Sequence, residues 1–260
     1  MFRRRGLPDG WESIVADHLA VWRALDTAER EQLQQDADWL LRHKHWEAAR
    51  DFALTDEMRV AIAAHAAVLV LGLDVSYYSE VSAIIVWPTT FGEGGAPLDP
   101  ISGRNHRTEP GIVPGLYNET PVRVLGQAHT RRGPVMIAWD DVVKGSSHPE
   151  RGHNVVYHEL AHKLDMLNDL VDGTPPLESR TDVDRWVEVC TDAFQALRDG
   201  AERPPLQPYG ATNPAEFFAV ATEAFFDVPI ELDEHEPDLY TVLRAFYNQD
   251  PAERARRTWA

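Results

Sequence analysis

The sequence has very little cysteine and a shortage of basic residues. Cys190 is the single cysteine among 260 residues, so no disulfide can form within the chain, and we expect its side chain to be a small buried hydrophobe. Lysine and arginine number 25 against 42 aspartate and glutamate residues, a formal net charge of -17. Proteins that bind nucleic acid or anionic membrane surfaces usually carry basic patches. The composition therefore argues against direct nucleic-acid binding and against membrane association.

The sequence also lacks a hydrophobic run long enough to cross a membrane. The longest apolar stretch, 60–73, contains His65 and is shorter than the ~18 to 20 residues that a membrane span needs. We expect a buried helix in which His65 is a hydrogen-bonded core residue. The basic start of the chain, 1–5, is followed by the polar turn 6–12 and not by the apolar segment of a signal peptide. These features predict a cytoplasmic protein.

The remaining pattern begins with a helical part and continues with a strand-rich part. Residues 11–80 have the amphipathic spacing of helices. Residues 81–145 contain three short segments rich in β-branched and aromatic residues, which predict strands over 83–87, 122–125 and 135–139.

A long segment between the first two predicted strands has no periodicity. Residues 92–115 are rich in glycine and proline, which predicts a loop. Loops of this length in compact domains are often functional. We hypothesise that this loop folds over an active site and restricts access of the substrate.

The last part of the chain, 150–260, is helical again. Its apolar periodicity predicts helices over 154–167, 182–197, 213–226 and 239–247. The acidic segment 231–236 is expected to be a solvated loop. Because no internal repeat is present, the pattern predicts one α+β domain over 1–260, with a small mixed sheet between N-terminal and C-terminal helices.

The helix predicted over 154–167 carries a candidate metal site. His158 and His162 are four residues apart, which places both imidazoles on one face of a helix, where they can share a zinc ion. Glu159 lies beside the first histidine and could be the general base for a zinc-activated water. Asp165 shares the face of the histidines and could accept the second N–H of a ligating imidazole. An ordinary helix with surface histidines is the alternative.

A catalytic zinc ion needs a third protein ligand. The metzincin arrangement would need glycine and histidine where the chain has Asp165 and Asn168, so it is excluded. The best candidate is Glu216, and Glu223, which lies on the same face of that predicted helix, is expected to support the site. Glu216 also fits a capping box with Asn213, in which it would serve the helix and not a metal. The residues alone leave these two alternatives open.

Several segments of the chain resemble one known family. The motif NVVYHELAHKLDML at 154–167 is similar to the Mlc titration factor A family of zinc peptidases. Further segments that resemble this family are 54–59, 71–74, 133–142, 213–220 and 223–226. The resemblance covers roughly residues 40–250 and departs from the family at 126–132, where substrate contacts are therefore in doubt, and in the loop 92–115.

The resemblance implies a zincin-like fold of the gluzincin type, with a catalytic core similar to that of the anthrax lethal factor protease. It implies one zinc ion per chain, bound by His158, His162 and Glu216, with Glu159 as the base. It also implies that Tyr209 stabilises the oxyanion, a role that suits a phenol donor.

Two functions follow as expectations. The first is a zinc-dependent peptidase that hydrolyses peptide substrates, with aminopeptidase-like cleavage implied by the resemblance. The alternative is a regulatory protein that binds and sequesters a transcriptional repressor, because the family is named for that property. A purely structural zinc site is disfavoured, since such sites usually have four protein ligands, often cysteines, and Cys190 is far from the motif.

Overall fold

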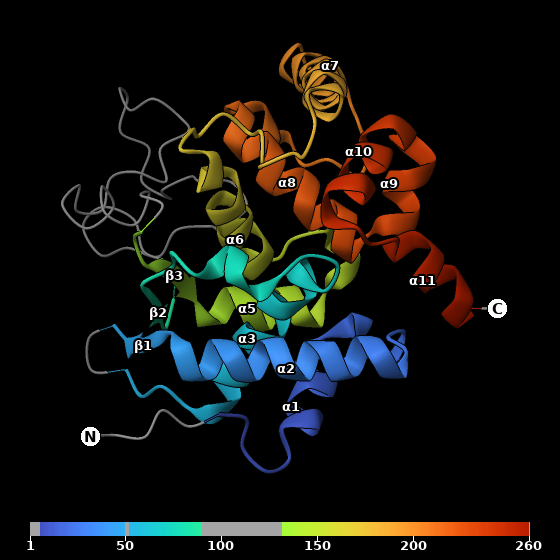
Figure 1. The fold of residues 1–260 in the computed structure, drawn as a ribbon. Helices are drawn as coiled ribbons and strands as arrows, with labels where there is room; N and C mark the ends of the chain where they lie inside the picture. Colours follow the sequence, from blue (N-terminus) through green and yellow to red (C-terminus); the bar gives the residue numbers. More distant parts are fainter. Residues whose placement is uncertain (1–5, 50–51, 90–131, 260) are drawn as a thin grey trace, which may run out of the picture.

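The computed structural model describes residues 6–49, 52–89 and 132–259, which form helices with a small sheet at one side of them (Figure 1). The elements up to residue 89 are α1 (Trp11–His18), the 3-10 helix η1 (Ala20–Arg23), α2 (Thr27–His43), β1 (His45–Ala48), α3 (Asp56–Val70), η2 (Val75–Tyr78) and β2 (Ala83–Trp87). The elements from residue 132 onward are β3 (Val135–Ala138), α5 (Trp139–Ser147), η4 (Pro149–Arg151), α6 (Val155–Asp165), η5 (Met166–Asn168), α7 (Arg180–Arg198), η6 (Pro208–Ala211), α8 (Pro214–Asp227), α9 (Pro229–His235), α10 (Pro237–Tyr247) and α11 (Pro251–Trp259). This arrangement agrees with the predicted α+β class.

The sheet has three strands in the order β1-β2-β3. Trp46 lies opposite Ile84, and Ile84 lies opposite Val135, with both pairings parallel. Parallel neighbours need a crossover connection, and α3 lies between β1 and β2 in the sequence. We expected a mixed sheet, but the strands of the described ranges pair only in parallel.

The strand predictions had three different outcomes. The segment 83–87 is β2 as predicted, and 135–139 is a strand as far as Ala138. Trp139 instead begins α5, whose first turn carries acidic side chains that favour a helix N-terminus. The predicted strand 122–125 and the predicted loop 92–115 lie outside the described residues.

The strand β1 was missed, because residues 45–48 fall inside the segment that we predicted to be helical. The strand has only four residues, and their side chains alternate between exposed and half-buried. So short an alternation cannot be distinguished from the polar end of the preceding helix without the pairing to β2. Tertiary pairing therefore decides the structure of this segment.

The helix α3 is the buried helix that the apolar stretch predicted. Thr55 caps it by accepting the N–H of Met58 at 3.2 Å, and nearly every residue from Met58 to Val70 is buried. A helix that is apolar on all sides is stable only when other elements surround it. Here α1, α2 and α6 pack against it. No helix in the described part of the chain combines the length and apolar character that a membrane span requires.

His65 is the buried, hydrogen-bonded core histidine that we expected. Its Nδ1 lies 2.9 Å from the carbonyl oxygen of Ala61, and its ring lies against that of Tyr157. Burial lowers the pKa of His65 to about 4, and the nearby His18 adds to the shift. The imidazole is therefore neutral in the folded protein under conditions in which the unfolded chain begins to protonate it.

This pKa shift predicts a loss of stability in mild acid. Between the unfolded pKa near 6.5 and the folded pKa near 4, the unfolded chain binds more protons, so the free energy of unfolding falls as the pH falls. From about pH 7 to about pH 5, His65 accounts for about 2 kcal/mol of this loss. Urea unfolding of His65→Gln should show a pH dependence smaller by that amount. His148→Gln, at an exposed histidine, is the control and should match the wild type; an unchanged pH dependence in His65→Gln would contradict the assignment.

The four helices predicted for the C-terminal part are confirmed as α6 with η5, α7, α8 and α10. The prediction of a solvated loop over 231–236 was wrong, because this segment belongs mostly to α9. Leu232 is fully buried, and the buried carboxylate of Glu236 accepts a hydrogen bond from Nε of Arg203 at 2.7 Å. The segment contains one buried leucine and one partly buried ion pair, but its composition is mostly acidic and therefore suggested solvent on all sides.

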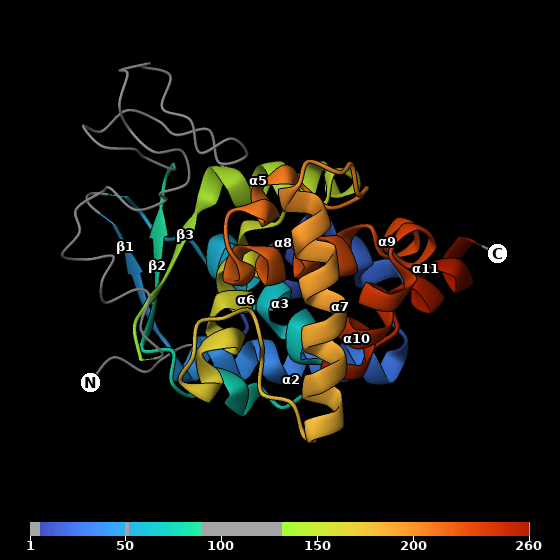
Figure 2. The ribbon, with the colours of Figure 1, turned by 90° about the horizontal axis from the view of Figure 1, so that it is seen from above.

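The helices α6 and α8 lie side by side and carry the predicted site residues (Figure 1). On its other sides α6 contacts α3 and β3, so the helix lies between the buried helix, the sheet and α8. Figure 2 shows α7 and α10 on the side of the molecule away from the sheet. Packing from several sides fixes the axis of α6, and with it the direction of the side chains that face α8.

Candidate metal centre

The two histidines of the sequence motif lie on α6 as predicted. Oδ1 of Asn154 accepts two N–H groups of the first turn, at 3.2 and 3.3 Å, which fixes where the helix begins. Leu160 and Leu164 are buried on the apolar face. His158 and His162 lie on another face, one turn apart, and their side chains are 12% and 11% exposed. The alternative of surface histidines is therefore excluded by burial.

Glu216 lies in the first turn of α8, and its carboxylate faces the histidines. Oδ1 of Asn213 accepts the N–H of Glu216 at 3.0 Å, as in a capping box. The side chain does not complete the box: Oε2 of Glu216 lies 3.0 Å from Nε2 of His158. In α2, by contrast, Asp26 and Glu29 make both hydrogen bonds of the motif. The cap at α8 is thus formed by Asn213 alone, which leaves the Glu216 carboxylate for the histidine cluster.

The three donor atoms form a triangle of the size that a metal ion requires. Nε2 of His158 and Oε2 of Glu216 are 3.0 Å apart, the two histidine Nε2 atoms are 3.3 Å apart, and Nε2 of His162 and Oε2 of Glu216 are 3.5 Å apart. A tetrahedral zinc ion with bonds of about 2.0 to 2.1 Å would hold its ligands about 3.3 Å from one another. Two imidazoles and one carboxylate also suit zinc chemically. The residues present therefore fit the ion.

Glu223, one of the two predicted supporting residues, contacts the Nδ1 side of the His158 ring. Its Oε1 lies 2.7 Å from Nδ1 of His158, and its Oε2 accepts the backbone N–H of Asn154 at 2.6 Å. A proton on Nδ1 leaves Nε2 as the lone-pair donor that faces the cluster. Asn154 was expected only to begin the helix. Its contact with Glu223 was missed because the two residues are far apart in the sequence.

The charges of the cluster shift the pKa values of its members in opposite directions. Burial disfavours the charged imidazolium, but Glu216 and Glu223 outweigh it and raise the pKa of His158. Burial also disfavours the Glu216 carboxylate, yet hydrogen bonds and charges from His158 and His162 lower its pKa well below the usual range. The two carboxylates thus create a site that favours positive charge, the property that a cation site requires.

Asp165, the other predicted supporting residue, does not make the expected contact. Its side chain is fully buried, and the structure gives no hydrogen bond between its carboxylate and His162. Burial raises the pKa of Asp165 to about 6, although the charge of His162 and the nearby N–H groups of Gly173 and Thr174 oppose the shift. Helical spacing correctly placed Asp165 near His162, but the side chain points toward the following loop.

Glu159 and Tyr209, the predicted catalytic residues, are both partly buried. Glu159 directly follows His158 on α6, and its charge acts on Lys163, a buried lysine whose pKa burial lowers to about 8. Tyr209 lies on η6, which packs against α8. Its ring centroid is 6.0 Å from that of His158. The structure therefore brings Tyr209 to the cluster although it lies far from α6 in the sequence.

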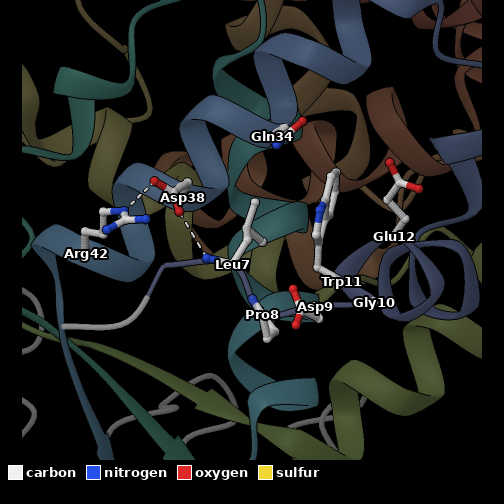
Figure 3. Close-up of a pocket in the computed structure, with 9 residues that line it drawn as sticks. All are labelled: Leu7, Pro8, Asp9, Gly10, Trp11, Glu12, Gln34, Asp38 and Arg42. Atoms are coloured by element: carbon white, nitrogen blue, oxygen red, sulfur yellow. Dashed lines mark hydrogen bonds and ion pairs between the residues drawn. The ribbon is translucent and has the colours of Figure 1, made fainter. Parts of the chain in front are cut away.

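A separate surface hollow is present near the start of the described chain (Figure 3). Trp11 and Glu12 line it together with Asp38, which accepts the N–H of Leu7 and pairs with Arg42. These contacts anchor the segment before α1 to α2. None of the residues of the metal cluster lines this hollow, so the two features are distinct.

Comparison with known proteins agrees with the chemistry of the cluster. Residues 1–248 match the family described as "Glucose-regulated metallo-peptidase M90". The chain belongs to this family. It is 31% identical over 256 residues to Mlc titration factor A of Serratia proteamaculans, which covers 96% of this chain and 90% of that protein. The resemblance to the Mlc titration factor A family is thereby confirmed.

Two further relatives show the same breadth of similarity. An uncharacterised protein of Synechocystis sp. is 35% identical over 251 residues, covering 95% of this chain and 86% of that protein. Mlc titration factor A of Edwardsiella ictaluri is 31% identical over 250 residues, covering 94% of this chain and 88% of that protein. Membership of a metallopeptidase family and the cluster of His158, His162 and Glu216 point to the same function, a metal-dependent peptidase.

Proposed function

We propose that the protein is a zinc-dependent peptidase with a single zincin-like domain and one zinc ion per chain. The observation that carries this proposal is the triangle of three donor atoms from His158, His162 and Glu216, whose sides match those of a tetrahedral zinc site. Catalytic zinc sites have three protein ligands and leave one position open. The described residues offer three such ligands, and their side chains are 11 to 15% exposed.

Each residue of the site has a chemical task in this proposal. A zinc ion held by the cluster would lower the pKa of a bound water toward ~7 and polarise the carbonyl group of the substrate. The carboxylate of Glu159 accepts a proton from the attacking water and passes it to the nitrogen of the leaving amine. The phenol O–H of Tyr209 donates a hydrogen bond to the oxygen that becomes negative. We further propose that this peptidase has an aminopeptidase-like action on short peptides.

The test of this function is hydrolysis of aminoacyl and short peptide substrates with and without zinc. The purified protein should cleave some members of a chromogenic panel, lose this activity after treatment with a chelator, and regain it when one equivalent of zinc is restored. Zinc bound at one ion per chain, together with no cleavage of any substrate, would contradict the proposal.

Glu223 provides a second prediction, because it orients His158 without reaching the substrate. Glu223→Gln keeps the size of the side chain but removes the carboxylate that accepts Nδ1–H of His158. Loss of such a partner typically weakens metal binding by ~10 to 100-fold. Competition with a chromophoric chelator should reveal this loss. Glu231→Gln, at an exposed glutamate of α9, is the control; equal affinities in both variants would mean that Glu223 only supports the fold.

A second function is favoured by the names of the relatives. Proteins named Mlc titration factor A match nearly the whole chain, so we also propose that this chain binds and sequesters a transcriptional repressor of the Mlc kind. If this binding is independent of peptidase activity, Glu159→Gln and metal-free protein should retain it in a pull-down experiment. Loss of repressor binding on metal removal would tie the two functions together, and no binding by the wild type would exclude the second.

A further inference from the structure

Two neighbouring aliphatic side chains are exposed in the loop that follows η5. Leu170 and Val171 are each 56% exposed. Only four large hydrophobic side chains are exposed in the described part of the chain, and these two are the most exposed of them. Single exposed apolar residues are common and need no explanation, whereas contiguous apolar patches often mark a contact with a ligand or partner. The exposure of Leu170 and Val171 therefore needs a functional explanation.

The loop that carries this pair, residues 168–174, connects the two sides of the cluster. It begins at the end of η5, which follows the helix α6 with His162, and Figure 1 shows it in yellow passing the start of α8 on the way to α7. Gly173 packs so closely on α8 that an added Cβ would lie 2.3 Å from the carbonyl oxygen of Pro214. Pro214 is two residues before Glu216. The loop thus lies at the ends of α6 and α8 that hold two of the three donors.

Three hydrogen bonds stabilise the backbone of this loop. The side chain of Asn168 accepts the N–H of Leu170 at 2.9 Å and donates to the carbonyl of Thr174 at 2.7 Å, which closes the loop on itself. The indole N–H of Trp186 donates to the carbonyl of Gly173 at 2.9 Å and fastens the loop to α7. A fixed backbone presents Leu170 and Val171 to solvent without further ordering, so a ligand would contact a preformed surface.

We propose that Leu170 and Val171 form a specificity surface that selects a large aliphatic side chain near the scissile bond of a peptide substrate. Contact with such a side chain would cover the two residues, and burial of apolar surface stabilises the complex in proportion to its area. This inference rests on the proposed peptidase function and specifies its substrate class.

The charges around the pair define the substrate further. Asp169 and Asp172 flank the aliphatic residues in the sequence and are exposed. The whole chain has a formal net charge of -17, which favours approach of positively charged ligands. The favoured substrate is therefore a peptide in which the aliphatic residue has a lysine or arginine neighbour. Added salt should weaken the effect of the basic neighbour and leave the effect of the aliphatic residue in place.

The test compares two proteins on a series of short peptides. The peptides differ at one position, Leu, Ala or Asp, and at its neighbour, Lys, Ser or Glu, with cleavage followed by mass spectrometry. The wild type should cleave the Leu–Lys peptide with a kcat/KM at least ~10-fold above that of the Ala–Lys peptide, because a few methylene groups in an apolar contact discriminate by this amount or more. In the double variant Leu170→Asn, Val171→Asn this ratio should fall to within ~3-fold of one, because kcat/KM for the Leu–Lys peptide falls.

A binding measurement and a matched variant complete the test. The Glu159→Gln protein should bind the uncleaved Leu–Lys peptide more tightly than the Ala–Lys peptide, and the double variant in that background should lose the preference. Val187→Asn removes an exposed valine from α7 and should behave as the wild type. A double variant that melts at the wild-type temperature and retains the Leu to Ala ratio overturns the inference alone. No cleavage of any peptide by the zinc-loaded wild type would instead overturn the proposed function and this inference with it.

Discussion

Glu159→Gln is expected to lower kcat by about 10²- to 10⁴-fold while leaving one zinc ion bound per chain. The amide keeps the size of the side chain but can no longer accept the proton of the attacking water. The metal ligands are unaffected, because Glu159 is not among the three residues whose donor atoms converge. Steady-state hydrolysis of the best substrate of the chromogenic panel, combined with metal analysis of the same protein sample, would measure both quantities.

The control for Glu159→Gln should make the same substitution at a nearby position in the sequence. Glu150→Gln makes the same substitution at an exposed residue of η4, shortly before α6. It should retain wild-type kcat and zinc content. Activity in Glu159→Gln within ~3-fold of the wild type, far less than removal of a general base costs, would show that another group takes the proton. A loss of zinc in that variant would show that Glu159 supports the metal instead.

The sequence predicted those parts of the fold that depend on local periodicity. The apolar run that became α3 and the pattern of α8 are long enough for the helical period to be recognised without tertiary information. The four-residue strand β1 and the helix α9 are short, and each depends on contacts with other elements. The strand β1 pairs with β2, and α9 buries Leu232 and packs against α8, α10 and α11. Elements stabilised mainly by distant contacts leave a weak local signal, which is why these two were missed.

The site shows the same division between local and distant information. The spacing of His158 and His162 within one helix sets their geometry, so the pair could be recognised from the sequence alone. The role of Glu216 could not be recognised from the sequence, because a capping residue and a metal ligand are both expected as a glutamate in the first turn of α8. Only the packing of α6 against α8 turns its carboxylate toward His158. For Asp165 the helical position was predicted correctly, but this position did not determine which way the side chain points.

Glu216→Gln is expected to lower zinc affinity by more than ~100-fold, since loss of a mere supporting residue already costs ~10 to 100-fold. The amide is a weaker ligand and brings no negative charge to the two imidazoles. The helix should survive, because Asn213 caps α8 through the backbone N–H of residue 216, which the substitution leaves in place. Zinc content after dialysis against a competing chelator, and the melting temperature without zinc, would test both statements.

Glu29→Gln is the matched control, because Glu29 occupies the same position in the capping box of α2. There the carboxylate serves the fold: Oε2 accepts the N–H of Asp26, and Oε1 accepts hydrogen bonds from the buried Arg254. Glu29→Gln should therefore lower the melting temperature and leave zinc binding unchanged, the reverse of Glu216→Gln. Zinc should also raise the melting temperature of the wild type and of Glu29→Gln, since a ligand stabilises the state that binds it. If zinc raised the melting temperature of Glu216→Gln equally, Glu216 would be a capping residue and the third ligand would lie elsewhere.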